Sequence, residues 1–200
     1  MKKRLFIAIE LPDKLKTELG YVVDQLATVG GLKSVKKDQL HITLAFLGDT
    51  DTARITSLKK IMDKVSRLTH PPKITPKLLS PFLNLADFRG VWVPVEMTPE
   101  LSNLANILRA ELINSGMHPD PKPFNAHITL ARHRSQRDLA GGGGAKSHVD
   151  LDELQSLLKE LSSPPLPPGL ANIITLFSSQ LTPQGHVYTN EHESKLEERE

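Results

Sequence analysis

The sequence predicts an α+β fold, and two observations carry this prediction. Segments rich in β-branched and aromatic residues alternate with segments whose apolar residues recur at the helical period. In addition, the segment His41–Ala45 recurs with the same letters at His127–Ala131, which indicates an internal duplication. We therefore expect a bilobal molecule of two pseudo-symmetric lobes, each with an antiparallel sheet and flanking helices, and a cleft between them.

The predicted strands share runs of strand-forming residues that are bounded by Gly, Pro or Asp. They are Arg4–Leu11, Leu32–Val35, Leu40–Leu47, Ile74–Leu85, Val91–Val95, Ala126–Ala131, Ala171–Leu181 and His186–Tyr188. The predicted helices share apolar residues spaced three and four apart. They are the segment opened by Pro12 and ended by Gly30, and the segments Thr52–Leu68, Pro99–Asn114 and Asp150–Leu161.

The remaining segments are predicted to be loops and a tail. Gln136–Ser147 contains Gly141–Gly144 and is predicted to be a mobile loop. The loop either acts as a flap over the cleft or only connects its neighbours. The proline-rich segment Ser163–Gly169 is expected to be an extended linker. We expect residues 1–190 to form a single bilobal domain and residues 191–200 to form a charged, frayed C-terminal tail.

Composition and charge restrict the class of protein. Of the 200 residues, 38% are hydrophobic and 24% charged, which is typical of a soluble globular protein. The absence of cysteine excludes disulfides and thiolate nucleophiles, and it fits a cytoplasmic protein. With 25 Lys and Arg against 23 Asp and Glu, the chain has too little excess charge to wrap long nucleic-acid duplexes, although a local basic groove for a short end remains compatible.

The duplicated segment places polar side chains on one face of a strand. Side chains alternate along a strand, so His41 and Thr43 point to one face. The opposite face carries Ile42, Leu44 and Phe46, which suits the core. The second copy repeats this pattern with His127. If the two copies are related by a pseudo-dyad, both polar faces line the same cleft.

This arrangement of residue types suits metal-free acid–base chemistry on a phosphoester. Two imidazoles with pKa values near neutrality can act as general base and general acid, and threonine hydroxyls can donate to phosphate oxygens. A lone His-x-Thr pair is usually structural, but a second identical copy favours function. A zinc site needs three or four ligands, and the other six histidines form no recognisable set, so we expect neither metal nor other cofactor.

At the level of whole segments, the chain resembles the two-histidine phosphoesterase superfamily, and most closely its RNA 2′,3′-cyclic phosphodiesterase branch, also called 2′–5′ RNA ligase. The segments that carry the resemblance are RLFIAIELP, QLHITLAFLGD, KPFNAHITLAR and LFSSQLTPQGHVY, in the family's order over nearly the whole chain. The chain departs from relatives at the rim of the site, where Ser34, Lys36-Lys37 and His186 stand.

The resemblance implies roles for five residues. His41 and His127 become the catalytic pair, and Thr43 and Thr129 the phosphate-binding pair. Arg132 resembles the family's arginine near the phosphate. Simple alternation places it opposite His127, so a solvated arginine at a strand end is the alternative. Which histidine is the base is left open.

The activity implied by the resemblance is hydrolysis of a terminal 2′,3′-cyclic phosphate to a 2′-phosphomonoester. The expected partners are RNA ends or nucleoside 2′,3′-cyclic phosphates, including tRNA fragments, for a monomer that binds no membrane. The alternatives are reversible ATP-independent 2′–5′ ligation, hydrolysis of another cyclic or 2′–5′-linked nucleotide, and a non-catalytic module that binds RNA ends or nucleotides.

Aromatic and basic residues near the motifs are candidates for contacts with RNA. Phe82 and Phe124 are candidates for base stacking as much as for core packing, whereas Trp92 is expected in the core. A basic segment before the first motif either guides an RNA backbone or is simply solvated. It contains Lys33, Lys36 and Lys37.

Overall fold

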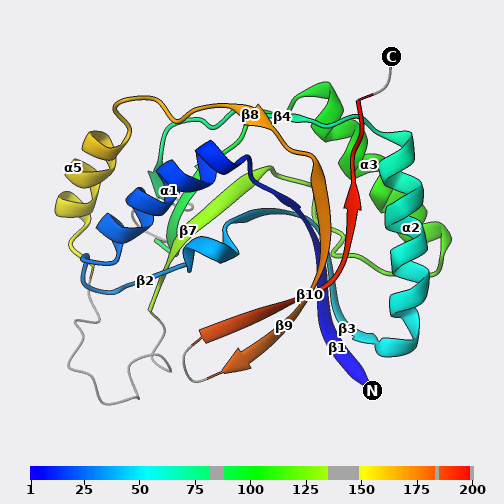
Figure 1. Ribbon diagram of the computed structural model, residues 1–200. Coiled ribbons are helices and arrows are strands. Elements are labelled where there is room, and N and C mark those ends of the chain that lie inside the picture. Colours follow the sequence, from blue (N-terminus) through cyan, green and yellow to red (C-terminus); the bar gives the residue numbers. More distant parts are fainter. Residues whose placement is uncertain (82–87, 135–148, 183–184, 199–200) are drawn as a thin grey trace.

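A computed structural model of the chain describes residues 1–81, 88–134, 149–182 and 185–198. This part is α+β, with two four-stranded antiparallel sheets, one two-stranded sheet and four α-helices (Figure 1). The helices are α1 (Asp13–Leu26), α2 (Ile55–Leu68), α3 (Pro99–Asn114) and α5 (Leu151–Leu161), with short 3-10 turns η1 (Lys37–Gln39) and η2 (Thr52–Arg54). All four helices fall where the apolar periodicity predicts them.

The first sheet has the strand order β10-β9-β1-β3 and contains the first copy of the repeat. Its strands are β1 (Lys2–Glu10), β3 (His41–Asp51), β9 (Ile173–Thr182) and β10 (Gly185–Lys195). The central strand β1 is buried on both faces from Leu5 to Ile9, which explains its near-continuous apolar run. Helix α2 contacts β10 and β9 and covers one face of this sheet.

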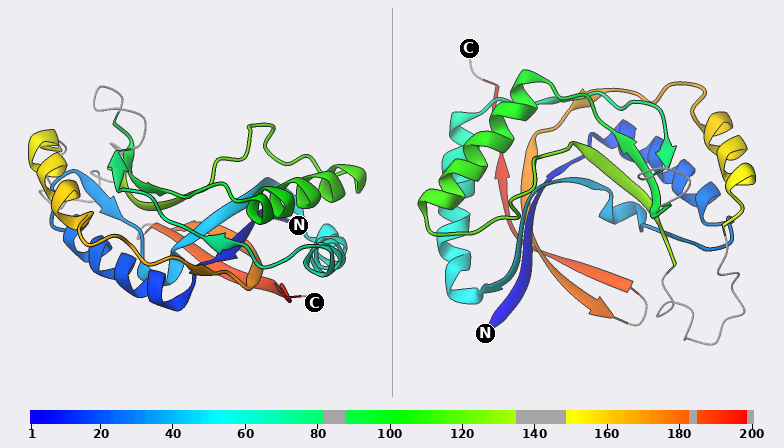
Figure 2. Two further views of the ribbon diagram at one scale, coloured as in Figure 1. Left: turned by 90° about the horizontal axis from the view of Figure 1, so that it is seen from above. Right: turned by 180° about the vertical axis from the view of Figure 1, so that it is seen from behind.

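The second sheet has the order β2-β7-β6-β5 and contains the second copy of the repeat. Its strands are β2 (Leu32–Ser34), β5 (Ser80–Pro81), β6 (Gly90–Pro94) and β7 (His127–His133). Helix α1 contacts β7 through the apolar face that its periodicity predicts. Figure 2 shows α2 and α3 together at one end of the molecule, and α1 and α5 at the other.

One predicted strand is interrupted in the structure. The predicted strand Ile74–Leu85 is replaced, over its described part, by the short β4 (Lys73–Ile74), which pairs with β8 (Gly169–Leu170), and by β5. Pro76, which lies between β4 and β5, explains the interruption, since proline has no N–H to donate to a neighbouring strand. The rest of that segment lies outside the described residues, as does Gly141–Gly144.

The predicted frayed tail from residue 191 is also wrong, because β10 continues to Lys195 and pairs with β9 along its length. Ser194 is buried, and its Oγ donates to Asp63 Oδ1 of α2 at 2.6 Å. His192 Nε2 donates to the same oxygen at 2.7 Å. Charged side chains on the solvent face of a strand resemble a tail in sequence, and only the pairing reveals the strand.

Among the described residues, no helix is long and apolar enough to cross a membrane.

Candidate active site

Both copies of the repeat line one cleft with a volume of about 890 Å³. Strand β3 carries His41 and Thr43, strand β7 carries His127 and Thr129, and the two strands contact each other. All four side chains line the cleft, while the intervening isoleucines of both copies are fully buried. The predicted division into a polar face and a core face is therefore confirmed from each histidine to its threonine. Beyond the first copy's threonine it is wrong, because Phe46, expected on the core face, lines the cleft.

Each copy contains a β-bulge directly after its threonine. The pairing of β3 with β1 skips Leu44, and the pairing of β7 with β6 skips Leu130. In each copy the extra leucine and the alanine after it are both buried, so the alternation of faces is reversed at this point. As a result, Phe46 and Arg132 line the cleft together with the histidines and threonines.

The backbone fixes the tautomer of His41. Its Nδ1 lies 2.6 Å from the carbonyl oxygen of Gln39, which only accepts, so Nδ1 carries the proton. Nε2 of the neutral ring is then the acceptor, and it lies 3.1 Å from Thr43 Oγ1, which donates to it. The ring also contacts the rings of Phe6 and Tyr188, with centroids 5.1 and 5.7 Å away.

His127 is held in the same way. Its Nδ1 lies 2.8 Å from the carbonyl oxygen of Asn125, two residues earlier, as Gln39 is for His41. Nδ1 is therefore the donor here too, and Nε2 is the nitrogen that can accept or give a proton. The indole of Trp92 packs against this ring with centroids 4.8 Å apart. The duplication thus extends to the hydrogen bonds that orient each imidazole.

Burial and positive charge lower the pKa of both histidines. The pKa of His41 is lowered from 6.5 to about 4, chiefly by burial and also by the charges of Arg132 and His127, against the opposing effect of the Gln39 carbonyl. Burial also lowers the pKa of His127, opposed by the Asn125 carbonyl and assisted by Arg132. Both rings are therefore predominantly neutral at pH 7 in the free protein.

Arg132 lies beside the histidines, and the bulge is the reason. Simple alternation placed its side chain opposite that of His127, but the extra residue in β7 returns it to the cleft face. Its charge acts on His41, His127 and Tyr188, which places it near all three. Arg132 therefore lines the cleft rather than pointing away from it at the end of its strand.

Three aromatic residues line the cleft although the sequence did not predict them there. Trp92 was expected in the core, but it is only half-buried and lines the cleft beside His127. Tyr188 also lines the cleft, and burial raises the pKa of its hydroxyl, although Arg132 opposes this. Phe46 is 38% exposed, and its ring stacks on that of Phe6. The sequence signal for Tyr188 was its place in the segment LFSSQLTPQGHVY, which carries part of the resemblance. The residue type alone gave no signal, because aromatic residues in strands are ordinarily core.

The structure places some of the other candidate residues in the cleft and others outside it. Phe124 lines the cleft, whereas Phe82 lies outside the described residues. Lys33 and Lys36 line the cleft. Lys37 does not, and its Nζ pairs with an oxygen of an α1 carboxylate, Asp24 Oδ2, at 2.5 Å. Within the described ranges, no three His, Asp or Glu side chains gather in a way that would hold a metal ion.

Comparison with protein families gives a match over most of the chain. Residues 9–84 and 91–188 match the family described as LigT like phosphoesterase. Among curated proteins, the RNA 2′,3′-cyclic phosphodiesterase of Archaeoglobus fulgidus is 30% identical over 186 residues, covering 92% of this chain and 96% of the relative. The protein of the same name from Methanothermobacter thermautotrophicus is 27% identical and covers 95% and 97%.

Solved structures share the fold. The crystal structure of TT0787 of Thermus thermophilus superposes with a TM-score of 0.72 at 25% identity and covers 96% of this chain and 97% of its own. The structure of Escherichia coli LigT complexed with 3′-AMP gives a TM-score of 0.70 at 24% identity, covering 99% and 100%. Because the family match spans both copies of the His-x-Thr repeat, the chain belongs to the LigT like phosphoesterase family.

Proposed function

We propose that this protein is an RNA 2′,3′-cyclic phosphodiesterase that opens a terminal 2′,3′-cyclic phosphate to a 2′-phosphomonoester. The observation that carries the proposal is the pair of imidazoles, His41 and His127, which line one cleft and each bind a carbonyl through Nδ1, so that Nε2 serves for proton transfer. The curated relatives that match nearly the whole chain bear the name of this activity. The duplication also supports a description as two pseudo-symmetric lobes that meet at the cleft.

The proposed reaction needs one neutral and one protonated imidazole. A water molecule attacks phosphorus while the neutral Nε2 removes its proton, the bond between phosphorus and the 3′ oxygen breaks, and the second imidazole donates its proton to that oxygen. Both histidines are predominantly neutral in the free protein at pH 7, so the acid takes up its proton when substrate binds. The anionic phosphate favours this step, because a nearby negative charge raises the pKa of an imidazole.

The remaining polar groups are suited to holding the phosphate. Thr43 and Thr129 carry hydroxyls that can donate to its non-bridging oxygens, where negative charge increases in the transition state. Arg132 can add a charge-assisted contact to the same oxygens. Trp92 and Tyr188 pack against the two imidazoles, which keeps the rings from turning away from the phosphate.

The proposal is tested by incubating the purified protein, in EDTA, with each nucleoside 2′,3′-cyclic phosphate and with a short RNA that carries this end. We expect 2′-phosphate products, and a loss of about 100-fold or more in kcat/KM for His41→Ala and for His127→Ala. Lys37→Ala, a change outside the cleft, serves as the control. An undiminished rate in either histidine variant, or strict dependence on added metal, would contradict the proposal.

Two other functions predict different outcomes of the same experiment. A ligase that runs the reaction in reverse would join paired tRNA halves more readily than it hydrolyses a cyclic dinucleotide. A binding module would bind the cyclic phosphates without turnover. The intact pair of proton-transfer groups argues against the binding module, since binding alone requires neither of them to change its protonation state.

A further inference from the structure

The two ends of the cleft differ in chemical character. We name one the basic end, because it is lined by Lys33, Lys36, Arg132 and His186. We name the other the aromatic end, because it is lined by Phe46 and Phe124. The difference begins at the two bulges, where one copy of the repeat places an arginine in the cleft and the other a phenylalanine.

At the basic end, Lys33 lies beside Arg132 and beside the β9–β10 hairpin. Lys33 of β2 is the direct cross-strand partner of Arg132 of β7, and such partners point to the same face with their Cβ atoms about 5 Å apart. The stem of Lys33 runs against the β9–β10 hairpin, since a Cβ added to Gly185 would lie 3.4 Å from Lys33 Cε. Gln39 Nε2 donates to the carbonyl oxygen of His186 at 3.0 Å and ties that hairpin to the rim.

The aromatic end contains an acidic side chain as well as the basic residues Arg109 and Lys122. Among the described residues that line the cleft, Asp120 is the one acidic side chain, and its backbone N–H donates to the carbonyl oxygen of Phe46 at 2.9 Å. Arg109 of α3 donates through Nη1 to the carbonyl oxygen of Asp120 at 2.8 Å, and the backbone N–H of Lys122 donates to Asp120 Oδ1 at 3.0 Å. The negative charge of the described cleft lining therefore belongs to the aromatic end, which makes the basic end the more attractive one for an anion.

The chemistry of a ribonucleotide matches this polarity. The base is attached to C1′, next to the carbon that bears the 2′ oxygen. The 5′ phosphate is attached through C5′ to C4′, next to the carbon that bears the 3′ oxygen. From a cyclic phosphate held between His41 and His127, base and 5′ phosphate therefore leave in opposite directions. An aromatic surface suits the base, and a basic surface suits the phosphate.

We propose that Lys33 and Lys36 form a second phosphate subsite, which binds the 5′ phosphodiester of the terminal nucleotide and makes the protein prefer an RNA chain end over a mononucleoside cyclic phosphate. This inference rests on the proposed function for the position of the cyclic phosphate. The lysines act as charge-assisted donors to an oxygen that takes no part in bond breaking, so they contribute to binding of the chain end rather than to the chemical step.

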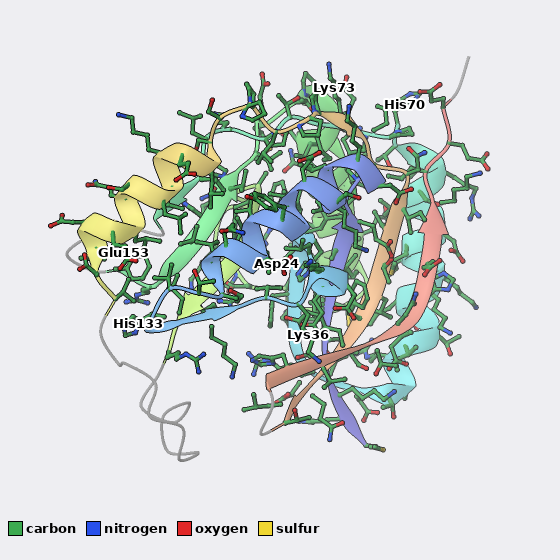
Figure 3. All side chains as sticks on the ribbon, turned by 60° about the vertical axis from the view of Figure 1, so that its left-hand side comes forward. Asp24, Lys36, His70, Lys73, His133 and Glu153 are labelled. Atoms are coloured by element: carbon green, nitrogen blue, oxygen red, sulfur yellow. The ribbon has the colours of Figure 1, made fainter. Side chains whose placement is uncertain are left out.

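The chain offers a matched control in the same segment. Lys37 follows Lys36 directly, but it does not line the cleft, and its Nζ is paired with Asp24 of α1. Figure 3 labels Asp24 on α1 and Lys36 below it in that view, toward the β9–β10 hairpin. Replacing Lys37 removes the same charge from the same stretch of sequence without touching the proposed subsite.

The first experiment measures binding and does not depend on turnover. Calorimetry compares adenosine 2′-monophosphate with adenosine 2′,5′-bisphosphate, which adds only the 5′ phosphate. We expect the wild type to bind the bisphosphate about tenfold more tightly or better, and the Lys33→Ala/Lys36→Ala double variant to lose about tenfold of this preference. Lys37→Ala should retain the preference, and Lys33→Arg/Lys36→Arg should retain most of it. Equal preference in the alanine double variant and the wild type would overturn the proposal.

The second experiment compares kcat/KM for a dinucleotide that ends in a 2′,3′-cyclic phosphate with kcat/KM for the matching mononucleoside. We expect the ratio to exceed one in the wild type and in Lys37→Ala, and to fall about tenfold in the double alanine variant. Turnover with the same ratio in every variant overturns the subsite and leaves the reaction standing. No turnover, together with a lysine-dependent preference for the bisphosphate, overturns the proposed function and leaves the subsite standing.

Discussion

Phe46 and Arg132 occupy equivalent positions in the two copies of the repeat, three residues after the threonine and just beyond a β-bulge. Both bulges reverse the alternation of side chains, so both residues line the cleft. One copy therefore contributes an aromatic ring and the other a fixed positive charge. This difference contributes to the asymmetry of the cleft, and it underlies two of the predictions below.

The lowered pKa values of the histidines predict an acidic optimum for kcat/KM. This quantity reports the free enzyme, in which the pKa of His41 is about 4 and that of His127 lies below 6.5. We expect a bell-shaped profile whose acid limb lies near pH 4 and whose alkaline limb lies below pH 6.5. The profile of kcat should lie at higher pH, because bound phosphate raises both pKa values. A maximum of kcat/KM above pH 7 would contradict the assignment of these groups.

Arg132→Ala should lower the rate and move the alkaline limb upward. The guanidinium lowers the pKa of both histidines, so its removal raises both and extends the pH range in which one remains protonated. Loss of the phosphate contact should lower kcat/KM by about 10- to 100-fold. Arg132→Lys keeps the charge and should keep the profile. A rate loss without any change in the pH profile would mean that Arg132 acts on substrate alone.

Trp92 is the only tryptophan of the chain, so its fluorescence reports on the cleft. Its indole packs on His127, and an imidazolium quenches an adjacent indole. We expect the emission of the free protein to fall as the pH decreases, with a midpoint below 6.5, the ordinary pKa of the histidine. His127→Ala should abolish this transition, whereas His133→Ala should retain it. If the transition persisted in His127→Ala, the fluorescence of Trp92 would not report the protonation of His127.

Asp63→Ala should destabilise the fold by about 1–3 kcal/mol, because it leaves Ser194 and His192 without their shared acceptor. Asp24→Ala is the matched change, since Asp24 pairs with Lys37 at the surface, and should cost less than about 1 kcal/mol. Burial raises the pKa of Asp63, but the bonds from Ser194 and His192 outweigh this and hold it below 3.8. The stability that the Asp63 carboxylate contributes is therefore fully present above pH 3.8, and it is lost as the pH falls through the lowered pKa. Denaturant unfolding at pH 7 and pH 3 measures both effects.

The sequence by itself determined the helices and the composition of the polar face. The helical period of apolar residues is a local property, and it predicted all four described helices. The strand period is also local, and it was sufficient to assign His41 and Thr43 to one face of their strand. The duplication then related His127 and Thr129 to the same cleft.

Only the tertiary structure decided the rest, because the deciding contacts join segments far apart in the chain. A bulge depends on the register of a neighbouring strand, so neither Arg132 nor Phe46 could be placed from alternation alone. Trp92 looks like a core residue until its strand is set beside β7. The charged end of β10 looks like a tail until its strand pairing and its bonds to Asp63 are known.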